Sequence, residues 1–164
     1  MLRFRDNHVA LIATGELLAP RHMTYQELYN QVEKLARALR RAGIKVGDRV
    51  AAFLPNAEYA IITLLASAAV GAVFSSASPD FGVQGALDRL GQIQPKLLFC
   101  VESVFEDGNH QSQIDKLVEI VAGLPSLDKV VFCDDLCTAT TLQSIPISYV
   151  FTLYWHEIRH MRDD

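Results

Sequence analysis

Near the end of the chain, one short stretch has the residue types and spacing of a catalytic metal site. HEIRH matches H-E-x-x-H, with His156 and His160 four positions apart and Glu157 beside the first histidine. Residues four apart on a helix share a face, so both imidazoles could bind one zinc ion while Glu157 acts as general base. The pattern therefore raises the hypothesis of a zinc hydrolase.

The sequence around this motif does not favour that hypothesis. Only four residues follow His160, whereas a zinc peptidase needs a third ligand downstream and a substrate cleft. Upstream, Cys133, Asp134, Asp135 and Cys137 have no recognised ligand spacing to the motif. Because a match at three fixed positions also arises by chance, we expect a solvated terminal helix and no metal site.

Composition and charge set the broad class of the protein. The 164 residues are half hydrophobic and about a fifth charged, which is typical of one globular domain with a core. The net charge of −4 and the lack of a basic tract give no indication of nucleic-acid binding. Three cysteines suit a reducing compartment better than a disulfide framework. Charged residues interrupt the N-terminus and the longest apolar stretch is short, so we expect a cytosolic protein without a membrane segment.

The elements that would position a site alternate regularly. Thr24 and Glu27 have capping-box spacing, an apolar stripe follows, and Gly43 suits the end of that helix. After it come a strand (DRVAAFLPN), a helix expected to be buried on all sides (AEYAIITLLASAAVG) and a second strand (AVFSS). A helix capped by Ser78 or Asp80 and ended by Pro95 follows. The stretches KLLFCV, QSQIDKLVEIVAGLP and KVVFC are then expected as strand, helix and strand.

This alternation predicts an α/β fold, specifically part of a doubly wound parallel sheet with crossover helices. The strands are continuous apolar runs, as expected where helices cover both faces of a sheet. The pattern is lost after Cys133, and we expect two regions, a family-like domain at 1–134 and a divergent tail at 135–164. Within the tail, ISYVFTLYW could form an added strand or an exposed adhesive segment.

Four stretches of the chain resemble the N-terminal subdomain of the adenylate-forming enzymes, which include the acyl-CoA synthetases. They are MTYQELYNQV, AGIKVGDRVAAFLPN, LLASAAVGAVFSSASPDFGVQGALDRLGQIQPKLLFCVE and GLPSLDKVVF. TYQEL and GDRVAAFLPN are widespread in that superfamily. SPDFG with RLGQIQPK is much narrower and is most similar to the acetoacetyl-CoA synthetases (acetoacetate–CoA ligases). The resemblance covers roughly residues 8–134.

The resemblance implies a two-step reaction that uses ATP, Mg²⁺ and CoA. ATP adenylates the carboxylate of acetoacetate with release of pyrophosphate, and the CoA thiol then displaces AMP to give the thioester. The expected partners are therefore the small molecules acetoacetate and CoA, in lipid and ketone-body metabolism. Activation is needed because a carboxylate oxygen is a poor leaving group.

The sequence departs from the family in its phosphate-binding loop. The family's loop is rich in Ser, Thr and Gly and ends in Pro-Lys, whereas the nearest stretch here, CTATTLQSIP, has neither glycine nor lysine. The later family motifs and the C-terminal domain with its catalytic lysine are not found in these residues. We therefore expect an N-terminal subdomain fragment, inactive alone, with no catalytic residue and no tightly bound cofactor.

Two loops correspond, by resemblance, to parts of full-length relatives that face CoA. The first comprises Ser78, Pro79, Asp80, Phe81 and Gly82, at the end of a strand, where α/β folds bind ligands. In it, Phe81 and Gly82 would let a pantetheine arm pass close to the backbone. The alternative is an ordinary capped helix start with Pro79 and Gly82 serving turn geometry.

The second loop comprises Asp107 with Gly108, Asn109 and His110. In acetyl-CoA synthetases the matching loop carries arginines that meet CoA phosphate, and this sequence has none there. The favoured alternative is a surface turn at EDGNH. Three functions thus stay open: part of a CoA ligase, a non-catalytic α/β binding or interaction module, and, least favoured, the zinc hydrolase.

Overall fold

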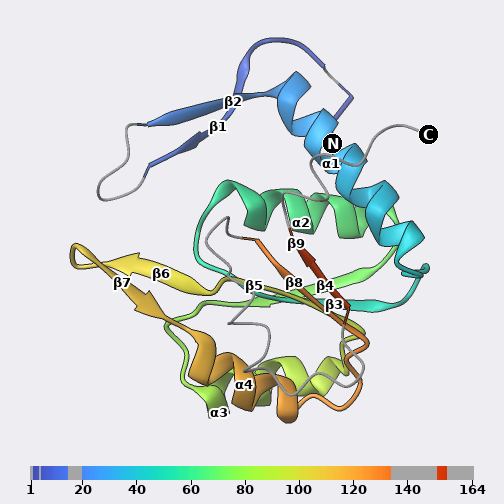
Figure 1. Cartoon of the computed structure of the whole chain (residues 1–164). Coiled ribbons are helices and arrows are strands. Elements are labelled where there is room, and N and C mark those ends of the chain that lie inside the picture. The colour runs from blue at the N-terminus through green and yellow to red at the C-terminus, as the bar shows by residue number, and fades with distance from the viewer. Residues whose placement is uncertain (1, 4, 15–19, 134–150, 155–164) are drawn as a thin grey trace.

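A computed structural model describes residues 2–3, 5–14, 20–133 and 151–154 (Figure 1). Its centre is a five-stranded sheet in the order β4-β3-β5-β8-β9, in which every neighbouring pair is parallel. The strands are β3 (Arg49–Phe53), β4 (Val73–Ala77), β5 (Leu97–Cys100), β8 (Lys129–Phe132) and β9 (Phe151–Tyr154). The predicted parallel sheet is confirmed, and the strand alternative for ISYVFTLYW is correct at β9.

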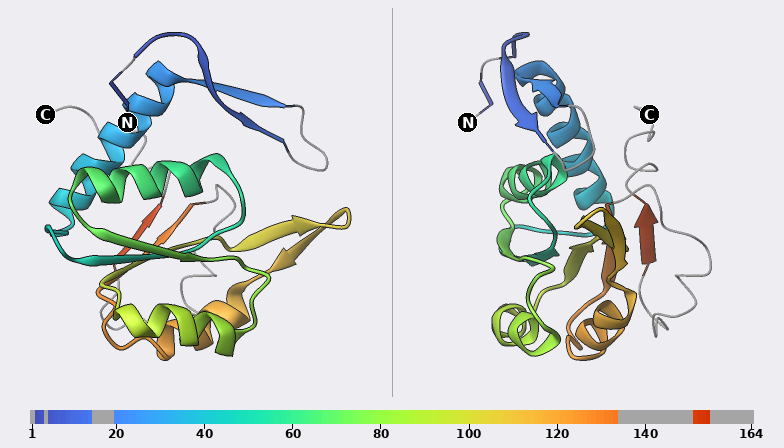
Figure 2. Two further views of the ribbon diagram at one scale, coloured as in Figure 1. Left: turned by 180° about the vertical axis from the view of Figure 1, so that it is seen from behind. Right: turned by 90° about the vertical axis from the view of Figure 1, so that its left-hand side faces the viewer.

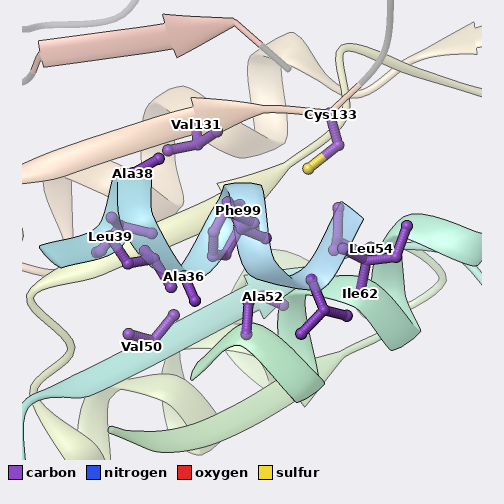
Figure 3. Close-up of a cluster of buried hydrophobic side chains, with 14 of the residues drawn as sticks. Ala36, Ala38, Leu39, Val50, Ala52, Leu54, Ile62, Phe99, Val131 and Cys133 are labelled. Carbon is purple, nitrogen blue, oxygen red and sulfur yellow. The ribbon is translucent and has the colours of Figure 1, made fainter. Parts of the chain in front are cut away.

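Helices cover the two faces of this sheet in pairs (Figure 2). Helices α1 (Tyr25–Arg41) and α2 (Glu58–Ala69) pack on one face, and α3 (Val83–Leu90) and α4 (Ile114–Ala122) on the other. Alternate strand residues divide between the two cores: Ala52 and Phe99 join the first cluster, whereas Ala51 and Leu98 join the second. Figure 3 shows part of the first cluster, with Phe99 among residues of α1, α2 and β3. The fold is therefore doubly wound, as predicted.

The strand order creates a point where the chain reverses its direction across the sheet. From β3 the chain passes through α2 to the edge strand β4, and then returns through α3 to β5 on the other side of β3. Loops that follow the carboxyl ends of β3 and β5 consequently diverge to opposite faces. In open α/β sheets, ligands bind at this carboxyl edge.

Helix α1 forms for the reasons visible in its sequence. The Thr24 hydroxyl accepts a hydrogen bond from the backbone N–H of Glu27 at 3.2 Å, and the Glu27 carboxylate accepts one from the Thr24 N–H at 2.7 Å. The apolar stripe is buried, including Leu28, Leu35 and Leu39. Gly43 follows the helix with a φ of 84°, a conformation that glycine adopts at little cost.

Two hairpins were not predicted. Strands β1 (Val9–Ala13) and β2 (Arg21–Thr24) pair antiparallel ahead of α1, and Arg21 joins this hairpin to α2 through an ion pair of 2.7 Å with Glu58. Strands β6 (Ser103–Glu106) and β7 (Asn109–Ser112) pair antiparallel between β5 and α4. Strands β2 and β7 have four residues each and are largely polar, so neither hairpin consists of two apolar runs like those of the central sheet.

The expectation that α2 is buried on all sides is wrong. Its inner face, including Ile62 and Ala66, is buried, but Ile61 and Leu64 are 39% and 41% exposed. Helix α1 and the sheet pack against this helix, and the β1–β2 hairpin contacts its first residue, Glu58. Composition alone made α2 appear uniformly apolar, whereas its position at the surface exposes one side.

Candidate functional site

The carboxyl edge of the sheet brings both candidate loops to one side of the molecule. Residues 78–82 connect the end of β4 to α3, and the β6–β7 hairpin follows the end of β5 and leads into α4. Because β4 and β5 flank β3 in a parallel sheet, their carboxyl ends point the same way. The hairpin extends outward from this edge, with its turn at the far end (Figure 1, Figure 2).

Loop 78–82 is a tight turn with its own hydrogen bonds. The Ser78 hydroxyl donates to Oδ2 of Asp80 at 2.8 Å, and the backbone N–H of Phe81 donates to the Ser78 carbonyl at 3.1 Å. The predicted cap by Ser78 or Asp80 is wrong: the N-cap of α3 is Gly82, and no side chain caps this helix. The side chains of Ser78 and Asp80 are hydrogen-bonded to each other, so they stabilise the turn and do not cap the helix.

Phe81 is held in place but remains accessible. The residue is 38% exposed, and the guanidinium of Arg89 lies 5.0 Å from the ring centroid. A Cβ at Gly85 would lie 3.2 Å from Cδ1 of Phe81, so the ring packs closely against this glycine. A partly exposed aromatic residue thus lies at the carboxyl edge.

Gly82 lies beside open space. Its φ of −66° and ψ of 165° are accessible to any residue, and a Cβ built there would meet no atom within 4 Å. The fold therefore does not demand glycine here for backbone angle or packing. Glycine is accepted at helix N-caps, and it also permits close approach of a ligand to the backbone.

Lys116 reaches this loop from α4. Its ammonium donates a hydrogen bond of 3.0 Å to the carbonyl oxygen of Pro79, which is buried and 37 positions away in the chain. Neither Lys116 nor Arg89 was expected from the sequence to lie at this loop. The position of Lys116 could have drawn attention to it. It lies in the first turn of α4, where the helix dipole disfavours a positive charge unless another group compensates for it.

The hairpin turn adopts a conformation that matches its sequence. Asp107 and Gly108 have φ angles of 49° and 75°, and Glu106 pairs with Asn109 on either side. Two successive positive φ angles suit an Asp-Gly hairpin turn. The ring of His110 meets Phe105 edge to face, with centroids 5.0 Å apart and planes at 74°. The predicted surface turn at EDGNH is confirmed, and Gly108, Asn109 and His110 are all exposed.

Potential metal ligands do not cluster in the described part of the chain. No group of three or more His, Cys, Asp or Glu side chains there could hold a metal ion. His156, Glu157 and His160 lie outside the described residues, as does Cys137. Cys100 and Cys133 are buried thiols that belong to the cores on opposite faces of the sheet, which suits packing better than metal binding.

Two surface hollows lie on the side of the first core. One, of about 390 Å³, lies between α1 and α2 and is lined mainly by apolar side chains, with Glu33 and Arg40 among them. The other, of about 350 Å³, lies between β1 and the start of α2. Neither hollow includes residues of the candidate loops. No helix in the described part of the chain has the length and apolarity needed to cross a membrane.

The sheet order and the loops at its carboxyl edge accord with a comparison to known families. Residues 2–148 match the family described as AMP-binding enzyme, and the chain belongs to this family. Within this family, the chain is similar to acetoacetyl-CoA synthetases. The chain is 52% identical over 136 residues to the acetoacetyl-CoA synthetase of Macaca fascicularis, and 42% identical over 146 residues to the acetoacetyl-coenzyme A synthetase of Rhizobium meliloti (strain 1021).

Solved structures give the same relationship. The acetoacetyl-CoA synthetase from Streptomyces lividans superposes with a TM-score of 0.83 at 35% sequence identity, over 95% of this chain and 23% of that chain. The alignments to the Macaca and Rhizobium proteins cover 80% and 87% of this chain but 20% and 22% of those relatives. The chain therefore spans about a fifth of the length of the curated relatives it matches.

Proposed function

We propose that this chain is the N-terminal part of the adenylating unit of an acid–CoA ligase that joins acetoacetate to CoA. The observation that carries the proposal is the 52% identity to an acetoacetyl-CoA synthetase over 136 residues of this chain. The fold match to a solved acetoacetyl-CoA synthetase supports it independently. The 164 residues by themselves form no acyl adenylate, because they contain no Gly- and Lys-bearing phosphate loop.

The proposed reaction has two displacement steps. A carboxylate oxygen of acetoacetate attacks the α-phosphorus of ATP, and pyrophosphate leaves with the electron pair of the broken P–O bond. The CoA sulfur, having lost its proton, then attacks the carbonyl carbon of the adenylate. The C–O bond breaks with its electrons on AMP, which is a far better leaving group than the original carboxylate oxygen.

Within that reaction, the part proposed for this chain is to bind and orient CoA. Loop 78–82 offers an ordered backbone, the partly exposed Phe81 and open space above Gly82. Gly108, Asn109 and His110 offer an exposed backbone and an imidazole at the hairpin turn. A pantetheine arm is mostly apolar with two amides, so an aromatic face beside accessible backbone suits it.

ATP and Mg²⁺ are assigned no residue in the described part of the chain. The carboxylates there form no cluster of three or more that would suit the oxygen coordination that Mg²⁺ prefers. We therefore assign no catalytic residue to this chain and derive no step through the metal. The residues of this chain would bind CoA and would form the carboxyl edge of the sheet at which it binds.

A segment exchange tests the proposal. Residues 8–133 of this chain would replace the matching segment of the Streptomyces lividans acetoacetyl-CoA synthetase, and thioester formation would be measured with ATP, CoA and either acetoacetate or acetate. We expect acetoacetate-dependent product and little with acetate. A folded hybrid that forms no thioester from acetoacetate overturns the ligase proposal.

Two assays on the 164-residue chain complete the test. Pyrophosphate release with ATP and acetoacetate is expected to equal a heat-treated control, and release above that control would overturn the statement that the chain alone is inactive. CoA binding is expected to be weak and measurable by NMR titration. CoA binding combined with a folded, inactive hybrid would favour a non-catalytic binding module instead.

A further inference from the structure

The β6–β7 hairpin carries no cation that could meet the phosphates of CoA. From Val101 to Asp115 the chain contains neither lysine nor arginine, and the turn region presents Glu106 and Asp107 to solvent. CoA carries several negative charges, and anions are bound where positive charge and N–H donors are available. If CoA lies along this edge, the positive charge must come from another element.

Two other cations that precede the hairpin in the sequence, Lys96 and Arg89, have different contacts. The ammonium of Lys96 donates to the Gly43 carbonyl and to Asp48 at the opposite, amino edge of the sheet. The guanidinium of Arg89 lies over the Phe81 ring. Lys116 remains, and its ammonium lies beside the carbonyl of Pro79, inside loop 78–82 itself.

The bond to Pro79 fixes the ammonium without neutralising it. An ammonium has three N–H donors, and the carbonyl accepts one of them at 3.0 Å. Among the described residues, Lys116 forms no ion pair. Its side chain is half-buried, so its charge is less screened by solvent than that of a fully exposed lysine. The site thus holds an oriented positive charge with donors to spare.

We propose that Lys116 is the residue that binds a phosphate group of CoA at this edge, held in position by its hydrogen bond to Pro79. This inference rests on the proposed CoA-facing role of loop 78–82. It assigns the electrostatic part of CoA binding to the first turn of α4, and the contact with the pantetheine arm to Phe81 and Gly82.

The test compares two ligands and three variants of the full 164-residue chain by NMR titration. Coenzyme A carries the phosphates, and pantetheine carries the arm without them. The variants are Lys116→Met, Lys116→Arg and the matched control Lys45→Met, which removes a lysine charge from an exposed position at the amino edge of the sheet. Thermal unfolding of each variant checks that the fold is kept.

We expect Lys116→Met to weaken CoA binding about tenfold and to leave pantetheine binding unchanged, since a charge-assisted hydrogen bond is lost for CoA alone. Lys116→Arg should bind CoA within about threefold of the wild type because it keeps the charge and its donors, and Lys45→Met should match the wild type. If Lys116→Met does not fold, Lys116→Gln takes its place, since it removes the charge but keeps N–H donors for the Pro79 carbonyl, and the same loss for CoA alone is expected.

Three results would overturn the inference, each in a different way. Unchanged CoA affinity in Lys116→Met shows that the lysine does not meet the ligand. An equal loss for CoA and pantetheine shows that it acts only by ordering loop 78–82. No binding of either ligand by the wild type removes the proposed CoA role of the loop, and with it this assignment.

Discussion

The ammonium nitrogen of Lys96 lies 3.1 Å from Oδ2 of Asp48, and this ion pair joins the start of β5 to the start of β3. Lys96 also donates to the carbonyl of Gly43, just past the end of α1. The same Asp48 oxygen accepts the backbone N–H of Lys45 at 2.8 Å. One carboxylate and one ammonium therefore tie a helix end and two central strands together at the amino edge.

This arrangement predicts a stability that depends on pH. The backbone N–H of Lys45 and the nearby Lys96 lower the pKa of the Asp48 carboxyl below its ordinary value of 3.8, against a smaller opposing effect of burial. A group whose pKa is lowered by folding stabilises the folded state above its unfolded pKa. That contribution is lost as the pH falls below about 4 through the lowered pKa of the folded state.

Asp48→Asn tests this dependence. At pH 7 we expect a loss on the order of 1 kcal/mol in the free energy of unfolding, because a charged acceptor is replaced by a weaker neutral one in a partly exposed site. Urea unfolding from pH 7 to pH 3 should show the gap between wild type and variant closing as the pH falls. Asp128→Asn, at an exposed aspartate, is the control. A difference between wild type and Asp48→Asn that stays constant with pH would contradict the prediction.

The cap of α1 gives a second stability prediction. Thr24→Ala removes the hydroxyl that accepts the Glu27 N–H and is expected to cost about 1 kcal/mol in the free energy of unfolding. Thr24→Ser keeps the hydroxyl and should lie within a few tenths of a kcal/mol of the wild type, as both residues are good N-caps. Equal destabilisation by both variants would assign the effect to the threonine methyl group instead. Chemical denaturation at neutral pH measures the difference.

The sequence was informative where a local pattern and the tertiary environment agree. Thr24, Glu27 and the apolar stripe that follows predict α1 because capping and packing require the same helix. The apolar runs around Phe53 and Phe99 likewise predict the buried strands that they form. The sequence predicted the doubly wound class of fold but not the order of the strands, because no local pattern determines which strands are neighbours.

The failures have both local and long-range causes. The hydroxyl of Ser78 was expected to cap α3, but it bonds Asp80, and the cap falls on Gly82. The β6–β7 hairpin had a usable Asp-Gly signal at positions 107 and 108, yet its strands are too short and polar to show alternation. The bond from Lys116 to Pro79 spans 37 positions and could not be predicted from either segment alone.

Gly108 provides a prediction that is local to the hairpin. At a φ of 75°, alanine in place of glycine is expected to cost about 1 kcal/mol, and this cost falls on a two-stranded element that is only marginally stable. Amide exchange in Ser103–Glu106 and Asn109–Ser112 should accelerate in Gly108→Ala, while exchange in α1 stays unchanged. Asp107→Asn, which tolerates positive φ equally well, is the matched control. Unchanged exchange in the hairpin of Gly108→Ala would contradict the role of this turn.

The last prediction separates stability from ligand binding at Gly82. Serine is a better N-cap than glycine by a few tenths of a kcal/mol, and no atom lies within 4 Å of the position of its Cβ. Gly82→Ser should therefore leave the thermal midpoint equal or slightly higher. If CoA passes close to this backbone, the added side chain occupies the same space, and CoA affinity should fall several-fold.

Gly91→Ala is the control for this experiment. Like Gly82→Ser, it adds a Cβ to a glycine. Gly91 has ordinary helical angles, and the nearest side-chain atom to the added Cβ, in Leu124, is 3.9 Å away. Because Gly91 lies at the other end of α3, it should gain stability without changing CoA binding. A Gly82→Ser chain that binds CoA as tightly as the wild type would show that the open space above Gly82 is not used by the ligand. The glycine would then be explained by its position at the helix cap alone.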